Sequence, residues 1–312
     1  MALSTLPARP PGPLDAALAG PLAGAASDLV GARPDDVVVV RAGLVDVAGL
    51  LARRVPSGPG GVVSLPGTVW SDTAGRTVGL AATLAGTVLN VAEELARHRS
   101  DLLAVPGAHP LTGDVLPLAE LADVAHAHGA RIAVDAGPLV AAGALDLAVG
   151  DVDHAVFTGL DVHAPLDAGV LVGRGDWLEP RPPLPRRPVS DALAAACREV
   201  AALPPGTLAV HEAQLRAAVL LLLRELPGVR AIAGWPDARR HAGLVAFTVD
   251  ERDPVDVARI LAVHHGLPGV TVVTDPAVAP AGPAVRLRLD AAWAGEDVDR
   301  LRNAIVDVLT SA

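Results

Sequence analysis

Short apolar runs rich in β-branched residues recur through the first half of this chain, each bounded by Gly, Pro or Asp. In order they are DDVVVVRAG (35–43), GGVVSLPG (60–67), DLLAVPG (101–107), RIAVDAG (131–137), HAVFTG (154–159) and AGVLVGR (168–174). Helical patterns lie between them, most clearly in LPLAELADVAHAHGA (116–130), which has Pro117 near its start and Gly129 as a stop signal. Apolar strands that alternate with helices predict an α/β domain whose mainly parallel sheet is covered on both faces.

A proline-rich stretch, LEPRPPLPRRPVSD (178–191), is the best candidate for a domain boundary. The segments beyond it predict helices at 189–203, 208–226, 254–266 and 296–309, and strands at 243–250, 269–274 and 284–290. We therefore expect a large α/β domain over residues 1–178, and a linker followed by a smaller α+β domain over residues 179–312.

The charge balance of the chain limits the partners that it can bind. Its formal net charge is −10, and all 25 residues of the Lys+Arg count are Arg, because the sequence contains no lysine. The arginines are scattered rather than gathered in one stripe, which argues against nucleic acid as a partner. The apolar stretches are too short to span a membrane, and a single cysteine fits a reducing compartment. We expect a soluble, cytoplasmic protein.

Ligands of parallel α/β sheets bind beyond the carboxyl ends of the strands, so the residues that follow the predicted strands are the site candidates. These segments are RAG (41–43), PGAHPLTG (106–113), DAGP (135–138) and TGLDVH (158–163). None of them contains the G-x-G-x-x-G pattern, and a phosphate-binding P-loop needs a lysine. The sequence therefore argues against dinucleotide and Walker-type nucleotide sites.

Two neighbouring stretches carry a resemblance to a known family. LTGDVLPLAELADVAHAHGARIAVDAG (111–137), followed by DVDHAVFTGLDVHAPLDAGVLVGR (151–174), resembles the centre of the class V aminotransferase and cysteine desulfurase family. HAGLVAFTVD (241–250) and VRLRLDAAWAGEDVDRL (285–301) are similar to its small domain. The resemblance implies the PLP-transferase fold type I, pyridoxal phosphate (PLP) as cofactor, and a dimer whose active sites lie at the subunit interface.

The resemblance also implies roles for three residues of this chain. Asp135 matches the aspartate that pairs with the pyridine nitrogen of PLP, and Thr158 matches a hydroxyl residue that contacts the phosphate. Arg286 matches the arginine that holds a substrate carboxylate through a bidentate fork. A simpler reading stays open for two of them, because Asp135 could be a helix N-cap and Arg286 lies in the alternating pattern of a half-buried strand.

Asp161 stands where the family has the lysine that forms the Schiff base with PLP. An aspartate cannot form an imine, so we assign no catalytic residue by resemblance. If Asp135 and Asp161 face one pocket, each raises the proton affinity of the other, and the pocket should repel the anionic cofactor. PLP is therefore expected to be held non-covalently at best, or to be absent.

Three interpretations follow, and the sequence does not choose a substrate among them. The first is a pseudoenzyme that binds a small amino-acid-like ligand or a partner. The second is an active enzyme that holds PLP or pyridoxamine phosphate (PMP) non-covalently, or works without a cofactor through Asp161 and His163. The third is a structural subunit of a heterodimer with an active paralogue. We expect no metal site, because the histidine pairs at 126/128 and 264/265 lack a third ligand at fitting spacing.

Overall fold

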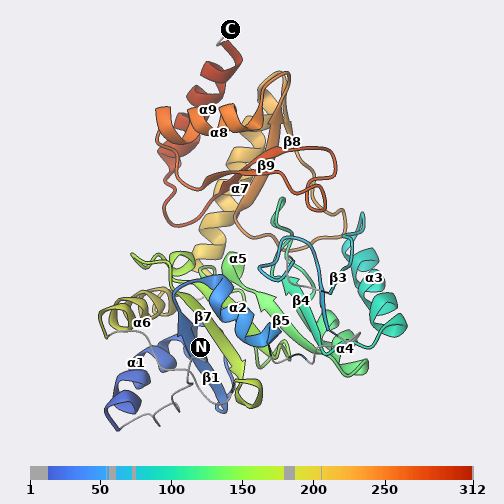
Figure 1. Cartoon of the computed structure of the whole chain (residues 1–312). Helices are drawn as coiled ribbons and strands as arrows, with labels where there is room; N and C mark the ends of the chain where they lie inside the picture. Colours follow the sequence, from blue (N-terminus) through green and yellow to red (C-terminus); the bar gives the residue numbers. More distant parts are fainter. Residues whose placement is uncertain are drawn as a thin grey trace, which may run out of the picture.

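The computed structural model describes residues 13–310 of the chain, except residue 54, residues 56–60, 72–74 and 179–186, and residue 205. Two separate sheets organise these residues, one of seven strands and one of four. The smaller sheet and its helices lie above the larger one (Figure 1). The expectation of a mainly parallel α/β domain with a second, smaller α+β domain is confirmed.

The larger sheet has the strand order β1-β7-β6-β5-β4-β2-β3. Its strands are β1 (Asp36–Arg41), β2 (Val62–Ser64), β3 (Arg76–Thr77), β4 (Leu102–Pro106), β5 (Arg131–Asp135), β6 (His154–Thr158) and β7 (Gly169–Arg174). Its helices are α1 (Pro13–Leu29), α2 (Leu44–Ala52), α3 (Leu84–Arg97), α4 (Leu118–Ala127), α5 (Gly137–Val140) and α6 (Arg187–Ala201).

Alternate residues of the same strand enter two different cores, which explains why these strands are apolar throughout. On β4, Leu103 and Val105 belong to the core that includes side chains of α1, α3, α4 and α6. Leu102 and Ala104 belong to the core on the opposite face, beneath α2. Both faces of the sheet are therefore covered, as the continuous apolar runs predict.

Strand β7 is the exception to the parallel arrangement, since it pairs antiparallel with both β1 and β6. The connection between β6 and β7 contains only the 3-10 turn η1 (Leu160–Val162). A parallel crossover needs about a dozen residues or more, usually including a helix, so this connection returns the chain antiparallel.

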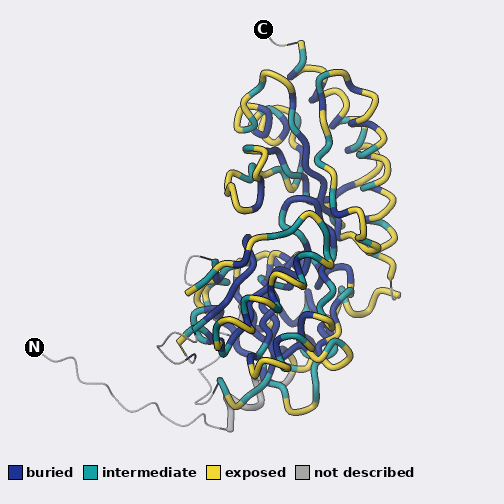
Figure 2. The backbone as a smooth tube through the Cα atoms, turned by 90° about the vertical axis from the view of Figure 1, so that its right-hand side faces the viewer, coloured by how far each residue is buried: buried dark blue, intermediate teal, exposed yellow. Residues whose placement is uncertain are grey.

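The smaller sheet has the order β10-β11-β9-β8, and all its pairs are antiparallel. Its elements are α7 (Thr207–Glu225), β8 (Val229–Ala231), β9 (Leu244–Val249), α8 (Pro254–Arg259), a π turn (Ile260–His264), β10 (Val270–Val273), β11 (Ala284–Arg288) and α9 (Gly295–Thr310). Helix α7 runs from the level of the larger domain into the smaller one (Figure 1). Figure 2 shows buried strands in both domains, with exposed helices and loops around them.

The predicted boundary at residues 178/179 borders residues 179–186, which lie outside the described residues, so it stays a prediction. Helix α6, which follows them, packs against α1, and its Leu193 and Cys197 are fully buried in the core of the larger domain. Of the helices in the described ranges, none combines the length and apolar character that crossing a membrane requires.

A segment before β9, residues 232–242, ties the smaller domain to the larger one. The Trp235 backbone N–H donates to Asp114, a fully buried carboxylate of the larger domain, at 2.7 Å. The Asp237 carboxylate accepts hydrogen bonds from the first two N–H groups of α3, at 2.9 and 3.1 Å. A carboxylate at a helix N-terminus satisfies free donors and opposes the positive end of the helix dipole. These contacts hold the two domains in one relative position.

The close approach of β7 to the turn before α2 gives a test of this packing. A Cβ atom added at Gly169 would lie 2.2 Å from the Gly43 carbonyl oxygen, so the backbone would have to move. We expect Gly169→Ala to lower the free energy of unfolding by about 1–3 kcal/mol, measured by urea denaturation. The control is Gly24→Ala in α1, where an added Cβ meets nothing within 4 Å. An equal loss in both variants would contradict this explanation.

Candidate functional site

The carboxyl ends of β5 and β6 meet beneath the smaller domain and bring together the residues singled out from the sequence. Asp135, the last residue of β5, is paired with Val156 of β6, and Thr158 ends β6. Asp161 follows in the turn η1. Strand β11 of the smaller domain supplies two arginines, Arg286 and Arg288, to the same region.

Asp161 is held on both of its carboxylate oxygens. Oδ2 accepts hydrogen bonds from the Thr158 backbone N–H and from the Thr158 hydroxyl, each at 2.8 Å. Oδ1 accepts from Nη1 of Arg288 at 2.6 Å. The Asp161 side chain is only 11% exposed, so this is a largely buried ion pair between the two domains. The predicted phosphate contact, Thr158, has its hydroxyl directed to Asp161.

Arg288 reaches Asp161 because of the alternation along β11. Val285 and Leu287 point into the core of the smaller domain, so Arg286 and Arg288 point from the opposite face toward the larger domain. Arg288 also donates to the Gly137 carbonyl at 3.3 Å. Burial disfavours its charge, but nearby carboxylates, Asp161 foremost, raise the pKa of Arg288 above its ordinary value. Arg288 therefore stays charged.

Gly137, at the start of α5, is required by the position of the Asp161 carboxylate. A Cβ atom at residue 137 would lie 2.9 Å from each of the two carboxylate oxygens. Any side chain here would displace Asp161 or break its contacts with Thr158 and Arg288. The DAGP segment thus contributes a close backbone approach as well as the Asp135 carboxyl.

Asp135 lies among groups that favour its neutral form. Burial, and then the charge of Asp161, raise the pKa of Asp135 to about 7, while hydrogen bonds from the backbone of Gly137 and Val69 lower it in part. The expectation that Asp161 raises the proton affinity of Asp135 is confirmed in direction. Near neutral pH the Asp135 carboxyl is therefore close to half protonated.

Arg286, the predicted substrate-binding residue, has no carboxylate partner among the described residues. Its Nη1 donates to the Pro110 carbonyl at 2.8 Å and its Nε donates to the Thr271 hydroxyl at 3.1 Å. Burial, together with the charge of Arg288, lowers the pKa of Arg286. This guanidinium is a half-buried cation with donors to spare.

Arg286 and Arg288 line a small cavity of about 80 Å³ between the domains. The other residues that line it are Pro138, Glu212, Ala242, Gly243, Leu244, Leu289 and Asp290. Glu212, on α7, is 5% exposed, and its Oε2 accepts from the Gly243 N–H at 2.9 Å. Burial raises the pKa of Glu212 to about 7. The cavity thus combines an arginine without an anionic partner and a buried carboxyl.

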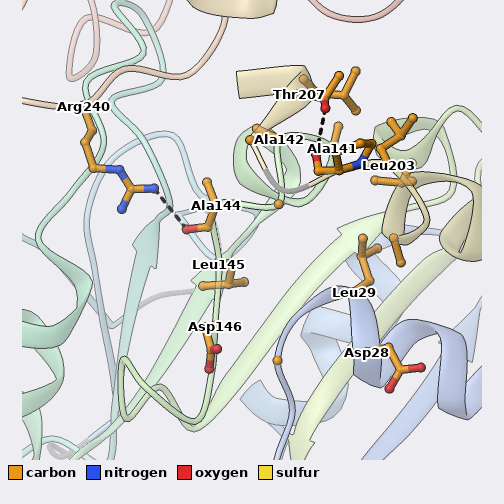
Figure 3. A pocket seen from close by; sticks show the side chains of 17 residues that line it. Asp28, Leu29, Ala141, Ala142, Ala144, Leu145, Asp146, Leu203, Thr207 and Arg240 are labelled. Atoms are coloured by element: carbon orange, nitrogen blue, oxygen red, sulfur yellow. Dashed lines mark hydrogen bonds between the residues drawn. The ribbon is translucent and has the colours of Figure 1, made fainter. Parts of the chain in front are cut away.

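A larger cavity, of about 400 Å³, lies beside α1, α6 and the start of α7 (Figure 3). Arg240 and Thr207 lie on its walls, and each hydrogen-bonds to a backbone carbonyl, of Ala144 and Pro204 respectively. Its charged side chains are exposed, and it shares no lining residue with the cavity at Arg286. It is a weaker candidate, because functional sites gather buried charged groups.

Part of the chain is similar to a known family. Residues 76–186 match the family model described as aminotransferase class-V. This match supports the resemblance read from residues 111–137 and 151–174, which fall inside the matched range.

The cysteine desulfurase of Dickeya dadantii is similar to this chain, at 30% identity over 193 residues. The match covers 53% of this chain and 46% of that protein. The chain spans less than half the length of the curated relatives that it matches.

Two solved structures show that the class-V fold extends over nearly the whole chain. The cysteine desulfurase CsdA of Escherichia coli superposes with a TM-score of 0.78 at 20% identity, covering 98% of this chain and 88% of that one. A C-DES mutant with glycine covalently linked to the PLP cofactor gives a TM-score of 0.75 at 20% identity, over 94% and 86% of the chains. The predicted fold type is confirmed, and the family uses PLP.

Two members of this class-V site were not assigned a role from the sequence. Arg288 was visible only as a second arginine on the face of Arg286, and its partner Asp161 is 127 residues away in the chain. Glu212 continues the apolar stripe of α7 formed by Leu215 and Val219, so a carboxylate at a core position was the available signal. In the described part of the chain, no three His, Cys, Asp or Glu side chains form a group that could hold a metal ion.

The ion pair predicts a strong coupling between two distant residues. Asp161→Ala leaves Arg288 and the Thr158 N–H without their acceptor, so we expect a loss of about 2–4 kcal/mol in the free energy of unfolding. Arg288→Ala should cost a similar amount, and the double variant should cost at least about 1 kcal/mol less than the sum. Glu93→Ala, which breaks the exposed pair with Arg97, should cost less than about 1 kcal/mol. Additive losses would contradict the coupling.

The raised pKa of Asp135 predicts a pH-dependent difference in stability. The unfolded chain loses the proton of Asp135 near its ordinary value of 3.8, and the folded chain loses it near 7. Between these values the folded state binds more protons, so this group's contribution to stability falls as pH rises, by at most about 1.4 kcal/mol per pH unit.

Asp135→Asn removes this dependence. The stability of the wild type relative to the variant should therefore fall as pH rises from about 4 to about 7, in urea denaturation at a series of pH values. Glu212 titrates in both proteins and cancels from the difference. Parallel stability curves would show that Asp135 has an ordinary pKa.

Proposed function

We propose that this protein is a class-V aminotransferase-like protein that lacks PLP Schiff-base catalysis and binds a small amino-acid-like ligand between its two domains. The observation that carries the proposal is the Asp161–Arg288 ion pair at 2.6 Å, at the position that the family resemblance assigns to the Schiff-base lysine. A carboxylate held in this way offers no amine to an aldehyde.

The residues around Asp161 do not fit PLP as a tethered cofactor. The sequence contains no lysine, so no side chain of the chain can form an imine with it. The Thr158 hydroxyl is engaged by Asp161 rather than free for a phosphate. Asp135 and Asp161 place two carboxyls at the site, and only one of them is ion-paired, which disfavours an anionic group. We derive no reaction step through PLP.

The groups that remain support binding of a carboxylate-bearing molecule. Arg286 lines the cavity and has no anionic partner among the described residues, and its planar guanidinium is suited to a carboxylate. The Pro110 carbonyl and Thr271 fix the orientation of the guanidinium at 2.8 and 3.1 Å. In this proposal Arg286 selects the ligand. Asp161 does not line the cavity, and it contacts the cavity wall through its ion pair with Arg288.

The alternative of an active enzyme has less support from the geometry. His163 is exposed and has a left-handed backbone, with φ of 60°. Asp161 is occupied by Arg288 and Thr158 and so is poorly placed to exchange protons with a substrate. Pairing with a second copy of the chain is part of the proposal, whereas pairing with an active paralogue is the structural-subunit alternative, and the experiment below separates the two.

Native mass spectrometry of the purified protein with PLP and with PMP tests the proposal. We expect the wild type to form no specific cofactor complex, and borohydride treatment with PLP to label no residue other than the terminal amine. Asp161→Lys supplies the missing amine and should gain a reducible adduct at position 161, whereas Asp161→Asn should not.

The same spectra report whether the protein is a homodimer or carries a lysine-bearing homologue. A homologue that copurifies would favour the structural-subunit alternative over ligand binding. A wild-type sample that turns over an amino acid with added PLP would overturn the proposal.

A further inference from the structure

The charged side chains that line the cavity at Arg286 come from more than one element of the smaller domain. Arg286 and Arg288 come from β11, and Glu212 comes from α7. Arg288 forms ion pairs with Asp161 and, at 3.4 Å between Nε and Oδ2, with Asp290. The Asp290 carboxylate also accepts a hydrogen bond from the Ala292 N–H at 2.9 Å. Among the described residues of the cavity wall, Arg286 and Glu212 are the charged side chains that form no ion pair within 4 Å, although the charge of Arg288 acts on Glu212.

Glu212 is placed where a carboxyl is costly unless something binds it. It is 5% exposed and stands on the apolar stripe of α7, yet it receives one hydrogen bond, from Gly243 to Oε2. Among the described residues no donor reaches its Oε1, and this oxygen is not fully buried, so it is open to the cavity. A ligand that brings a donor into the cavity can hydrogen-bond to it there.

The size of the cavity limits the ligand to a small molecule. One bound water occupies about 10–15 Å³ of cavity volume, so the cavity of about 80 Å³ has room for roughly five to eight non-hydrogen atoms. A cofactor with a ring and a phosphate exceeds this volume. A two- or three-carbon molecule with two polar ends fits it.

We propose that this cavity binds a small zwitterion intact, with its carboxylate on Arg286 and its ammonium group on Glu212. The inference rests on the proposed function and makes it more specific, because a ligand that carries only a carboxylate would leave Glu212 without a donor. Glu212 is then a ligand-binding residue. In a PLP enzyme the aldehyde of the cofactor binds the amine of the substrate, whereas in this proposal the Glu212 carboxylate binds it.

The geometry also sets how binding depends on pH. The groups that act on Glu212 are Arg288, Asp290 and the Gly243 N–H, and Arg286 lines the same cavity. Burial raises the pKa of Glu212 to about 7; the Gly243 hydrogen bond and the charge of Arg288 lower it in part, and the charge of Asp290 adds a smaller increase. An ammonium group binds the ionised carboxylate, so the affinity for a zwitterion should rise as pH increases through about 7.

Titration calorimetry with glycine and with acetate tests the proposal, because acetate has the carboxylate without the amine. We expect glycine to bind at least about tenfold more tightly than acetate at about pH 8, as a charged hydrogen bond contributes roughly that factor. Lowering the pH to about 6 should weaken glycine binding severalfold and leave acetate binding nearly unchanged.

Glu212→Gln keeps an acceptor for the Gly243 N–H and removes the charge. It should abolish the preference for glycine over acetate and the pH dependence, while its acetate affinity reports an intact cavity. Glu225→Gln is the matched control, since it makes the same change on the same helix at an exposed residue paired with Arg302. It should bind glycine like the wild type.

The outcomes separate this inference from the proposed function. Equal affinity for glycine and acetate, or an unchanged preference in Glu212→Gln, overturns the zwitterion assignment and leaves the carboxylate site at Arg286 in place. Absence of binding for both probes overturns the zwitterion assignment together with the ligand-binding part of the proposed function. Chemical conversion of glycine in the calorimeter overturns the proposal of intact binding.

Discussion

The ion pair between Asp161 and Arg288 joins the two domains at the point where the strands of the larger sheet end. Its geometry requires three other features of the chain. Thr158 donates twice to the carboxylate, Gly137 leaves room for it, and β11 must turn its even-numbered residues toward the larger domain. The position of the smaller domain, and hence the shape of the cavity between the domains, depends on this ion pair and on the hydrogen bonds that residues 232–242 form with the larger domain.

Arg288 is the positive charge nearest to several carboxyl groups, namely Asp161, Asp290 and Glu212. Because it is paired with Asp161, it offsets the remaining carboxyls only in part, and burial holds the pKa of Asp135 and of Glu212 near 7. Both carboxyls are therefore partly protonated near neutral pH, which lessens the negative charge of the region.

The class-V relatives show how such a site can arise without a change of fold. The main-chain scaffold superposes on two cysteine desulfurases over nearly its full length at 20% identity or below. The scaffold depends on buried apolar strands and glycine turns, which tolerate wide substitution if the pattern is kept. Schiff-base chemistry depends on a single lysine amine. In our proposal the loss of that lysine ended the reaction, and the cavity between the two domains remained.

Most of the fold was predictable from local patterns, and the site was predictable only in part. Strands β1, β4, β5, β6 and β7 follow the apolar runs of the sequence, because burial on both faces leaves a clear signature. Short strands such as β3 and β8 were not predicted, because a segment of two or three residues is too short to show a hydrophobic periodicity. Asp135, Thr158 and Asp161 were predicted as site residues because they lie at or just after the ends of strands. The hydrogen bonds from Thr158 to Asp161 were not predicted.

The sequence by itself determined the alternation of strands and helices and the absence of any lysine, and the resemblance predicted that Asp161 stands at the position of the family's lysine. These properties are local, since each is contained in a single residue or a short periodic segment. Only the tertiary structure decided that Arg288 pairs with Asp161, that Arg286 has no carboxylate partner among the described residues, and that Glu212 lines the same cavity. These properties depend on the register of β11 and on the placement of one domain over the other, and hydrogen bonds between residues more than a hundred positions apart leave no periodic trace in the chain.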